Sequence, residues 1–426
     1  MEQSQKKKRK KTITKQITAL VFLGLLILLC VLNLVLGDKK VPGPKLTAEG
    51  ILDGGYMEEY GEYFTKRFCG KSIFRGIHFS VQTTFGKRKS EGIYKGEGQY
   101  LLEKIAVPDE KAMGENIQKI QELAGTYYNI PIYFMLVPNA ANIQSEKLPA
   151  YAVGLDQTKQ FDKIRESLGA GITWVEVSKA LMKHSDEELY YRTDNNWTSL
   201  GAHYGYEALA AAMELDTSKA PELTPYVVNN DYIGTLAKQS GYGKGYEDSI
   251  TIYVPKNTKN SIRTVMSNMD TKKKYATLYD SMKLEKEDKY SLFLGGDAGM
   301  IDIRTTADTT DRLLILKDSF ANCLIPFLVP YYREIVAVDP ALYEGSIQEI
   351  MQKTKFTSIL FLYSGNSFVT DKDIARVLGT AAPETAEGTD AGKSSEGDSG
   401  EVSSDGGDGG GDDEDSQDGD TDDETE

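Results

Sequence analysis

Short apolar runs alternate with helical patterns through much of this 426-residue chain. The apolar runs are typical of buried strands and cover residues 132–137, 172–175, 313–316, 335–338 and 358–363. The helical patterns cover residues 109–127, 157–168, 199–213, 321–329 and 346–353. Strands joined by crossover helices form parallel sheets, and strands that are apolar on both sides need cover on both faces. The sequence therefore predicts an α/β protein with three layers, a sheet between two layers of helices.

Residues 223–310 break this alternation. Short segments rich in Tyr, Thr and Lys follow one another there, separated by Gly and Asn. We expect a mostly β or irregular region, inserted into a folded domain of residues 46–380 and packed beside the strand at 313–316.

The N-terminus carries a membrane signal. Six consecutive basic residues (6–11) precede an apolar stretch of twenty residues, 17–36, which is long enough to span a bilayer as a helix. No small-x-small cleavage site follows it, which favours an uncleaved anchor over a secretory signal or a buried helix of a soluble protein. The positive-inside rule then predicts that residues 1–16 are cytoplasmic and that the domain is extracellular, at the cell membrane, after a linker of residues 37–45.

The negative charge is concentrated at the other end of the chain. Of the net charge of −15, residues 381–426 contribute 18 acidic side chains against one Lys, so the remaining 380 residues sum to +2. This tail has too little apolar surface to offset the entropy of ordering, and we expect it to be disordered. Its Asp-rich stretch lacks the spacing of a calcium-binding EF-hand loop, so a diffuse electrostatic role is the remaining alternative.

Few residues could hold a metal or a nucleotide. The chain has three histidines, His78, His184 and His203, and no zinc-ligand spacing or Walker-type glycine loop. Cys30 lies in the apolar stretch, which leaves Cys69 and Cys323 as the possible extracellular pair. We expect no metal, no cofactor and no nucleic-acid partner.

One serine stands at a predicted strand-to-helix turn. The strand at 313–316 ends in Asp318-Ser319, and a helix is expected from Ala321. Unpaired N–H groups at a helix N-terminus can stabilise an oxyanion beside such a hydroxyl. An ordinary helix-capping serine is the alternative.

Two sequence motifs resemble a known family. Arg-Thr-Asp-Asn-Asn-Trp-Thr at 192–198, followed by Leu-Gly-Ala, and Lys-Asp-Ser-Phe-Ala-Asn-Cys at 317–323 resemble the DHHW family. That family consists of SGNH-hydrolase-like proteins related to alginate O-acetyltransferases. The similarity includes the segments 92–100, 137–139, 147–149 and 361–363. It implies a flavodoxin-like fold in permuted order, with a serine, an aspartate and a histidine acting on acyl esters of envelope polysaccharides.

Carried over to this chain, the resemblance assigns the catalytic positions. Ser319 matches the nucleophile, Asp194 the orienting carboxylate, and Asn196 stands at the position of the basic histidine. An amide cannot take the serine proton near neutral pH, so catalysis would be impaired. His203, about two helical turns further on, is too distant to replace the base directly and is expected to pack among aromatic residues. Asp318 and Asp297 are alternative bases only if their pKa values are strongly raised.

Five residues are candidates for binding substrate: Arg192, Trp197, Asp318, Gly296 and Asp297. Arg192 could bind an acyl or phosphate oxygen or instead pair with Asp194. Trp197 could stack on a sugar or instead anchor the core. Gly296 and Asp297 belong to a Gly-Gly-Asp-Ala-Gly loop in which the resemblance implies a histidine; this chain has none there.

These observations predict an anchored O-acetyltransferase or acetylesterase of cell-envelope polysaccharide, impaired by Asn196. Its expected partners are the polysaccharide or an acyl donor protein. The alternative is a catalytically inactive glycan-binding or scaffold protein of the envelope.

Overall fold

The computed structural model describes residues 2–36, 89–90 and 92–379, apart from 151, 153, 242–244 and 258–260, together with isolated positions between 43 and 81. The predicted acidic tail, the linker except Gly43, Cys69 and His78 lie outside the described residues.

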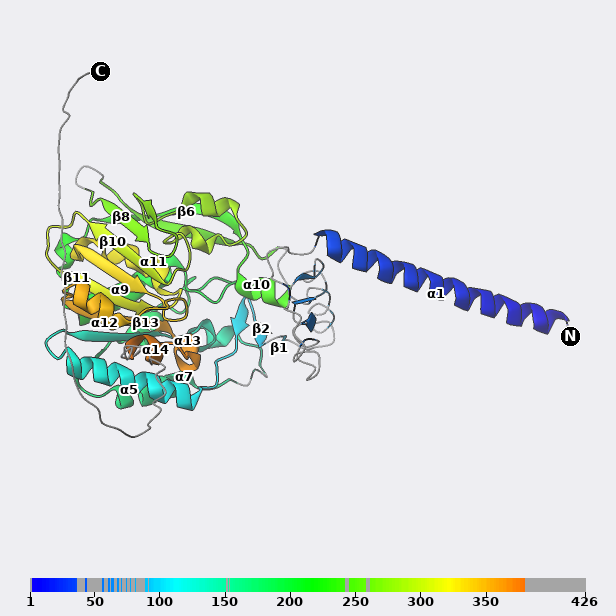
Figure 1. Cartoon of the computed structure of the whole chain (residues 1–426), viewed down its shortest axis with the longest axis horizontal. Helices are drawn as coiled ribbons and strands as arrows, with labels where there is room; N and C mark the ends of the chain where they lie inside the picture. The colour runs from blue at the N-terminus through cyan, green and yellow to red at the C-terminus, as the bar shows by residue number, and fades with distance from the viewer. Residues whose placement is uncertain are drawn as a thin grey trace, which may run out of the picture. The chain divides into compact units, whose positions relative to one another are not determined.

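An eight-stranded sheet forms the centre of the domain (Figure 1). Its strands, in spatial order, are β5 (Thr173–Trp174), β4 (Ile132–Val137), β13 (Ser358–Ser364), β11 (Arg312–Lys317), β12 (Glu334–Val338), β10 (Met300–Thr305), β8 (Thr264–Asn268) and β9 (Lys273–Tyr275). The first five strands run parallel, and the last three are antiparallel to their neighbours. The five apolar runs of the sequence therefore form the parallel half of the sheet, as predicted.

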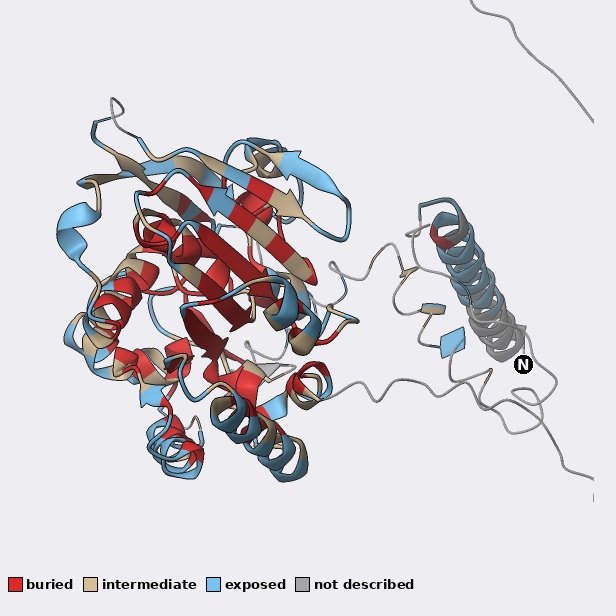
Figure 2. Ribbon diagram, turned by 60° about the vertical axis from the view of Figure 1, so that its left-hand side comes forward, coloured by how far each residue is buried: buried red, intermediate tan, exposed pale blue. Residues whose placement is uncertain are grey.

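The parallel strands bury side chains on both faces of the sheet. In β11, Leu313 and Ile315 belong to one hydrophobic cluster, whereas Leu314 and Leu316 belong to the other. Figure 2 shows these central strands as buried along their length. The three-layer α/β/α architecture is thus confirmed, with one core on each side of the sheet.

Two groups of helices supply the outer layers. Buried residues of α8 (Val177–Lys183), α9 (Ser199–Ala212) and α11 (Ala321–Leu328) join the first cluster. The second cluster includes buried residues of α5 (Glu110–Thr126), α7 (Gln157–Leu168), α12 (Ile347–Lys353), α13 (Gly365–Thr370) and α14 (Ile374–Leu378). Side-chain caps fix several starts: Asp109 accepts from Ala112 N in α5, and Thr198 accepts from Gly201 N in α9.

The region 223–310 is β-rich, but none of its strands pairs with the serine-bearing strand β11. β6 (Leu223–Tyr232) and β7 (Asp248–Pro255) form a separate antiparallel pair, with α10 (Thr235–Ser240) between them in sequence. β8, β9 and β10 instead extend the central sheet, where β10 pairs with β12. The region therefore does not pair with β11 in the sheet, because β12 lies between them. It packs near β11 through the core, where Phe293 shares a hydrophobic cluster with Ile315, and Tyr290 OH donates to Ser319 O at 3.1 Å.

The smaller elements connect or flank these layers. A three-stranded sheet consists of β1 (Lys89–Ser90), β2 (Ile93–Lys95) and β3 (Leu101–Glu103). The short helix α6 (Ala140–Ile143) follows β4. Single 3₁₀ turns are η1 (Ser145–Lys147), η2 (Thr217–Lys219), η3 (Ser281–Glu285), η4 (Tyr290–Leu292) and η5 (Val329–Tyr331).

The N-terminal helix α1 (Glu2–Leu36) contains the apolar stretch of the sequence. Residues Gln16–Asn33 have a mean hydropathy of 2.4, and this helix is the one in the described part of the chain that is long and apolar enough to cross a membrane. An N-terminal signal sequence would pass the same test.

Candidate active site

Ser319 lies in the turn between β11 and α11, at the carboxyl end of a central parallel strand. The carboxylate of Asp318 fixes this turn: Oδ1 accepts from Phe320 N at 3.0 Å, and Oδ2 accepts from Ser364 N, at the end of β13, at 2.8 Å. The turn is thereby tied to the neighbouring strand. Burial raises the pKa of Asp318 above its usual value, and the hydrogen bonds from Ser364 and Phe320 oppose that shift.

The three predicted catalytic residues form one hydrogen-bonded line. Ser319 Oγ donates to Asn196 Oδ1 at 3.0 Å, and Asn196 Nδ2 donates to Asp194 Oδ1 at 2.8 Å. The backbone N–H of Asn196 also donates to Asp194 Oδ1, at 2.9 Å. Asp194 and Asn196 are buried, whereas Ser319 is partly exposed. The fold therefore brings together two motifs that are 123 residues apart.

The second oxygen of Asp194 is held by the β-rich region. Asp194 Oδ2 accepts from Tyr232 OH at 2.9 Å and from Thr235 N at 2.6 Å. Between these residues, Gly234 approaches so closely that an added Cβ would lie 2.3 Å from Asp194 Cβ. The contacts of Tyr232 and Gly234 with Asp194 were not predicted from the sequence. Nothing in the local sequence pattern indicates which distant carboxylate a residue at the end of a strand will contact.

This line orients the serine but does not activate it. An asparagine carbonyl accepts a hydrogen bond from the hydroxyl, yet it cannot carry the proton away as a neutral imidazole would. The amide is also fixed in direction, because its Nδ2 is bound to Asp194. Ser319 thus stays a hydroxyl, and loss of the base in such a triad typically lowers turnover by about 10⁴-fold or more.

Backbone donors for an oxyanion are limited at this turn. Phe320 N–H is engaged with Asp318, and Asn322 N–H donates to Ser319 O at 3.1 Å. Ser319 N–H has no acceptor among the described residues and is the donor that remains beside the hydroxyl.

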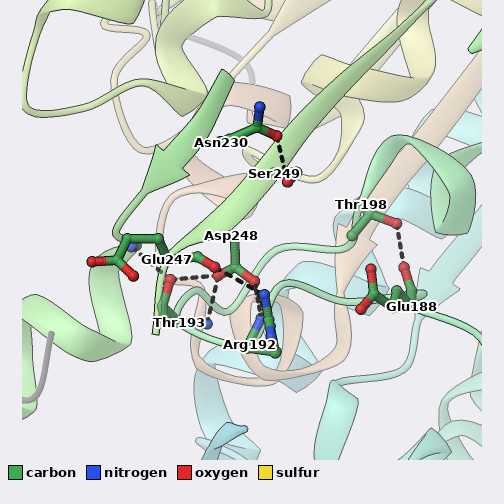
Figure 3. A network of polar contacts seen from close by, with 9 residues as sticks. Glu188, Arg192, Thr193, Thr198, Asn230, Glu247, Asp248 and Ser249 are labelled. Carbon is green, nitrogen blue, oxygen red and sulfur yellow. Dashed lines mark hydrogen bonds and ion pairs between the residues drawn. The ribbon is translucent and has the colours of Figure 1, made fainter. Parts of the chain in front are cut away.

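Arg192 pairs with a carboxylate other than the one considered from sequence. Its Nε donates to Asp248 Oδ1 at 3.2 Å, its backbone N–H donates to the same oxygen at 3.0 Å, and a guanidinium N–H donates to Glu247 O at 2.8 Å (Figure 3). Thr193 N donates to Asp248 Oδ2 at 2.9 Å. The pairing of Arg192 with Asp194 was therefore wrong. Through these hydrogen bonds Asp248, in β7, holds residues 192 and 193, which precede Asp194. Burial raises the pKa of the Asp248 carboxyl.

Trp197 is fully buried, so its ring offers no face to a sugar. Its Nε1–H donates to Phe320 O at 2.8 Å, which connects the start of α9 to the serine turn. An added Cβ on Gly205 would lie 2.6 Å from the indole ring, which shows how closely α9 packs against it. The core-anchor alternative accounts for this placement, and the sugar-stacking alternative does not.

The glycine-rich loop 295–299 contacts the helix that follows the serine turn. Asp297 is exposed, and its Oδ1 accepts from Asn322 Nδ2 in the first turn of α11 at 3.0 Å. Gly296 has a φ of 102°, and an added Cβ would meet Ser291 Oγ at 2.8 Å, so glycine is required there. Asp297 is thus near the turn but forms no hydrogen bond with Ser319 among the described residues.

Neither described histidine replaces the missing base. His203 packs against Tyr253 and Phe327 and lies 3.5 Å from Glu207, and burial lowers its pKa. His184 stacks on Tyr204 and contacts Glu187 at 2.7 Å. Cys323 is buried in the core, and burial raises the pKa of its thiol to about 12. Within the described ranges, no three His, Cys, Asp or Glu side chains are grouped as metal ligands.

The fold and the Ser319 turn define a three-layer α/β/α protein with a serine at the strand-to-helix turn of a central parallel strand. The sequence profile described as "DHHW protein" matches residues 106–338, which is more than half of the chain. The chain therefore belongs to the DHHW family.

Solved structures agree with this fold. A DHHW family protein from Eubacterium siraeum has a TM-score of 0.58 and 20% identity, covering 68% of this chain and 95% of its own. Bacillus cereus PatB1 with a sulfonyl adduct has a TM-score of 0.56 and 20% identity, covering 67% of this chain and 97% of its own. A comparison with curated protein sequences finds no match.

Proposed function

We propose that this protein is a single-pass, membrane-anchored member of the DHHW family whose extracellular domain acts on acetyl esters of cell-envelope polysaccharide. In this proposal it is an O-acetyltransferase or acetylesterase of low turnover. The observation that carries the proposal is the hydrogen bond from Ser319 Oγ to Asn196 Oδ1, in line with Asp194. The apolar stretch of α1, with basic residues 6–11 before it in the same helix, supports the anchor and an N-terminus in the cytoplasm.

The proposed reaction uses Ser319 as the nucleophile. Its Oγ forms a bond to the acyl carbon, the ester bond of the donor breaks, and the serine proton leaves with the departing alcohol. The acyl group then passes from Ser319 to a polysaccharide hydroxyl, or to water in the esterase reaction. Asp194 fixes Asn196, Asn196 orients Ser319, and Ser319 N–H faces the developing oxyanion. Because no base takes the proton of Ser319 or of the acceptor hydroxyl, both steps are slow.

Covalent labelling tests the nucleophile. PatB1 carries a sulfonyl adduct in one of its structures, which makes a sulfonyl fluoride the natural probe. We expect slow labelling of the full-length protein at Ser319, none in Ser319→Ala, and unchanged labelling in the control Ser167→Ala, which alters an exposed serine outside the site. Equal labelling of wild type and Ser319→Ala would refute the proposed nucleophile.

The second candidate is a glycan-binding or scaffold protein without catalysis. It is favoured by the direction of the Asn196 amide, which accepts the hydrogen bond of Ser319 and donates to Asp194 at the same time. Full-length protein should then bind purified cell-wall or capsular polysaccharide, and Ser319→Ala should bind equally well. Absence of binding to either material would exclude this candidate.

A further inference from the structure

A pocket of about 540 Å³ lies at the opposite end of α11 from Ser319. Its walls come from the β6–β7 pair, from β8, and from residues 326–330 at the end of α11 and in η5. The eight residues of α11 correspond to a rise of about 12 Å, so this pocket is distinct from the serine turn. Its volume falls within the range of roughly 300–1,000 Å³ found for small-molecule sites.

The walls of the pocket are mainly apolar. Pro255, Pro326, Pro330, Tyr253, Phe327 and Leu278 contribute to them. Two of the three tyrosine hydroxyls at the pocket are bonded elsewhere: Tyr206 OH to Tyr331 OH at 2.5 Å, and Tyr279 OH to Tyr253 O at 3.4 Å. The rings of Tyr206 and Tyr279 are therefore available to a ligand mainly through their apolar surfaces.

The pocket has a single charged lining residue, Arg263. Its side chain is exposed and forms no ion pair with a carboxylate in the part of the chain that the structure describes. The lining contains no Asp, Glu, Asn or Gln. This composition disfavours a sugar, whose hydroxyls are usually bound by such planar polar groups, and it complements a ligand with one negative charge.

We propose that this pocket binds a long-chain fatty acid, with the acyl chain against the proline and tyrosine walls and the carboxylate on Arg263. The guanidinium can form two parallel hydrogen bonds with a carboxylate, which fixes the head of the chain at the mouth of the pocket. The apolar walls then supply the binding free energy. This inference is independent of any reaction at Ser319.

Photocrosslinking tests the proposal. The full-length protein in lipid nanodiscs is irradiated with a diazirine derivative of palmitic acid, and the labelled peptides are mapped by mass spectrometry. We expect labels on residues 261–279 and 326–330 that excess palmitate displaces. Arg263→Gln, and Thr277→Trp at the exposed rim, should each lower this labelling at least fivefold. The matched control Arg333→Gln, at an exposed arginine outside the pocket, should not.

Two results would overturn the proposal. One is labelling confined to α1, or unaffected by Arg263→Gln and Thr277→Trp. The other is equal labelling of the pocket peptides by the uncharged diazirine alcohol of the same chain length, since the carboxylate would then have no role.

Discussion

Ser319 Oγ donates a hydrogen bond to Asn196 Oδ1 at 3.0 Å, although the two residues are 123 positions apart. The contact has the geometry of a nucleophile facing its base, but the acceptor is a neutral amide. The site is thus assembled without the group that would remove the serine proton.

Asp194 should contribute to stability as well as to orientation. It accepts four hydrogen bonds, from Asn196 N and Nδ2, Tyr232 OH and Thr235 N. Asp194→Ala leaves these buried donors unpaired, so we expect the free energy of unfolding of the full chain to fall by about 3 kcal/mol in urea denaturation. The control Asp308→Ala, at an exposed aspartate, should change it by less than about 0.5 kcal/mol. A similar effect of both substitutions would contradict the buried network.

Gly234 should be required for the placement of Asp194. A Cβ at this position would lie 2.3 Å from Asp194 Cβ and 2.5 Å from its Oδ2. Gly234→Ala should therefore lower the free energy of unfolding by about 1–3 kcal/mol, as overpacking typically does. Gly171→Ala, where an added Cβ meets nothing within 4 Å, is the matched control. Equal stability of the two variants would show that residue 234 has room for a side chain.

Asp339 should make stability depend on pH. Burial raises its pKa from 3.8 to about 6, nearby Asp297 and Asp318 add to the shift, and Lys317 opposes it. The folded protein therefore binds this proton more tightly than the unfolded chain, and stability falls as pH rises from about 4 through 6. Relative to Asp339→Asn, the wild-type free energy of unfolding should fall by about 2–3 kcal/mol between pH 4 and pH 7. Parallel pH curves, or a rise, would contradict this.

The parallel half of the sheet could be predicted from sequence because its signal is local. A run such as Ile132–Val137 is apolar on both faces, and β4 has those bounds. Helix 157–168 likewise agrees with α7. The serine turn was found for the same reason, since a buried strand, a polar pair and a helix follow one another directly.

The surroundings of the site could not be predicted, because they depend on contacts between distant segments. From the sequence, Arg192 could pair with Asp194. In the fold it pairs with Asp248 instead, because β7 places that carboxylate next to the guanidinium. The burial of Trp197 depends on the packing of α9 and Phe320. In the same way, the position of β10 next to β12 follows from pairing across the sheet rather than from its own sequence.

The most direct test restores the base. We expect Asn196→His to raise hydrolysis of p-nitrophenyl acetate by the full-length protein at least about 10²-fold, since a positioned general base typically contributes 10²–10⁴-fold. The gain should vanish in the double variant Ser319→Ala/Asn196→His, and Asn195→His, which adds the same side chain one residue away, should give no gain. If Asn196→His folds as the wild type does and hydrolyses the ester no faster, or if its gain persists without Ser319, then Ser319 and residue 196 do not form an acyl-transfer site.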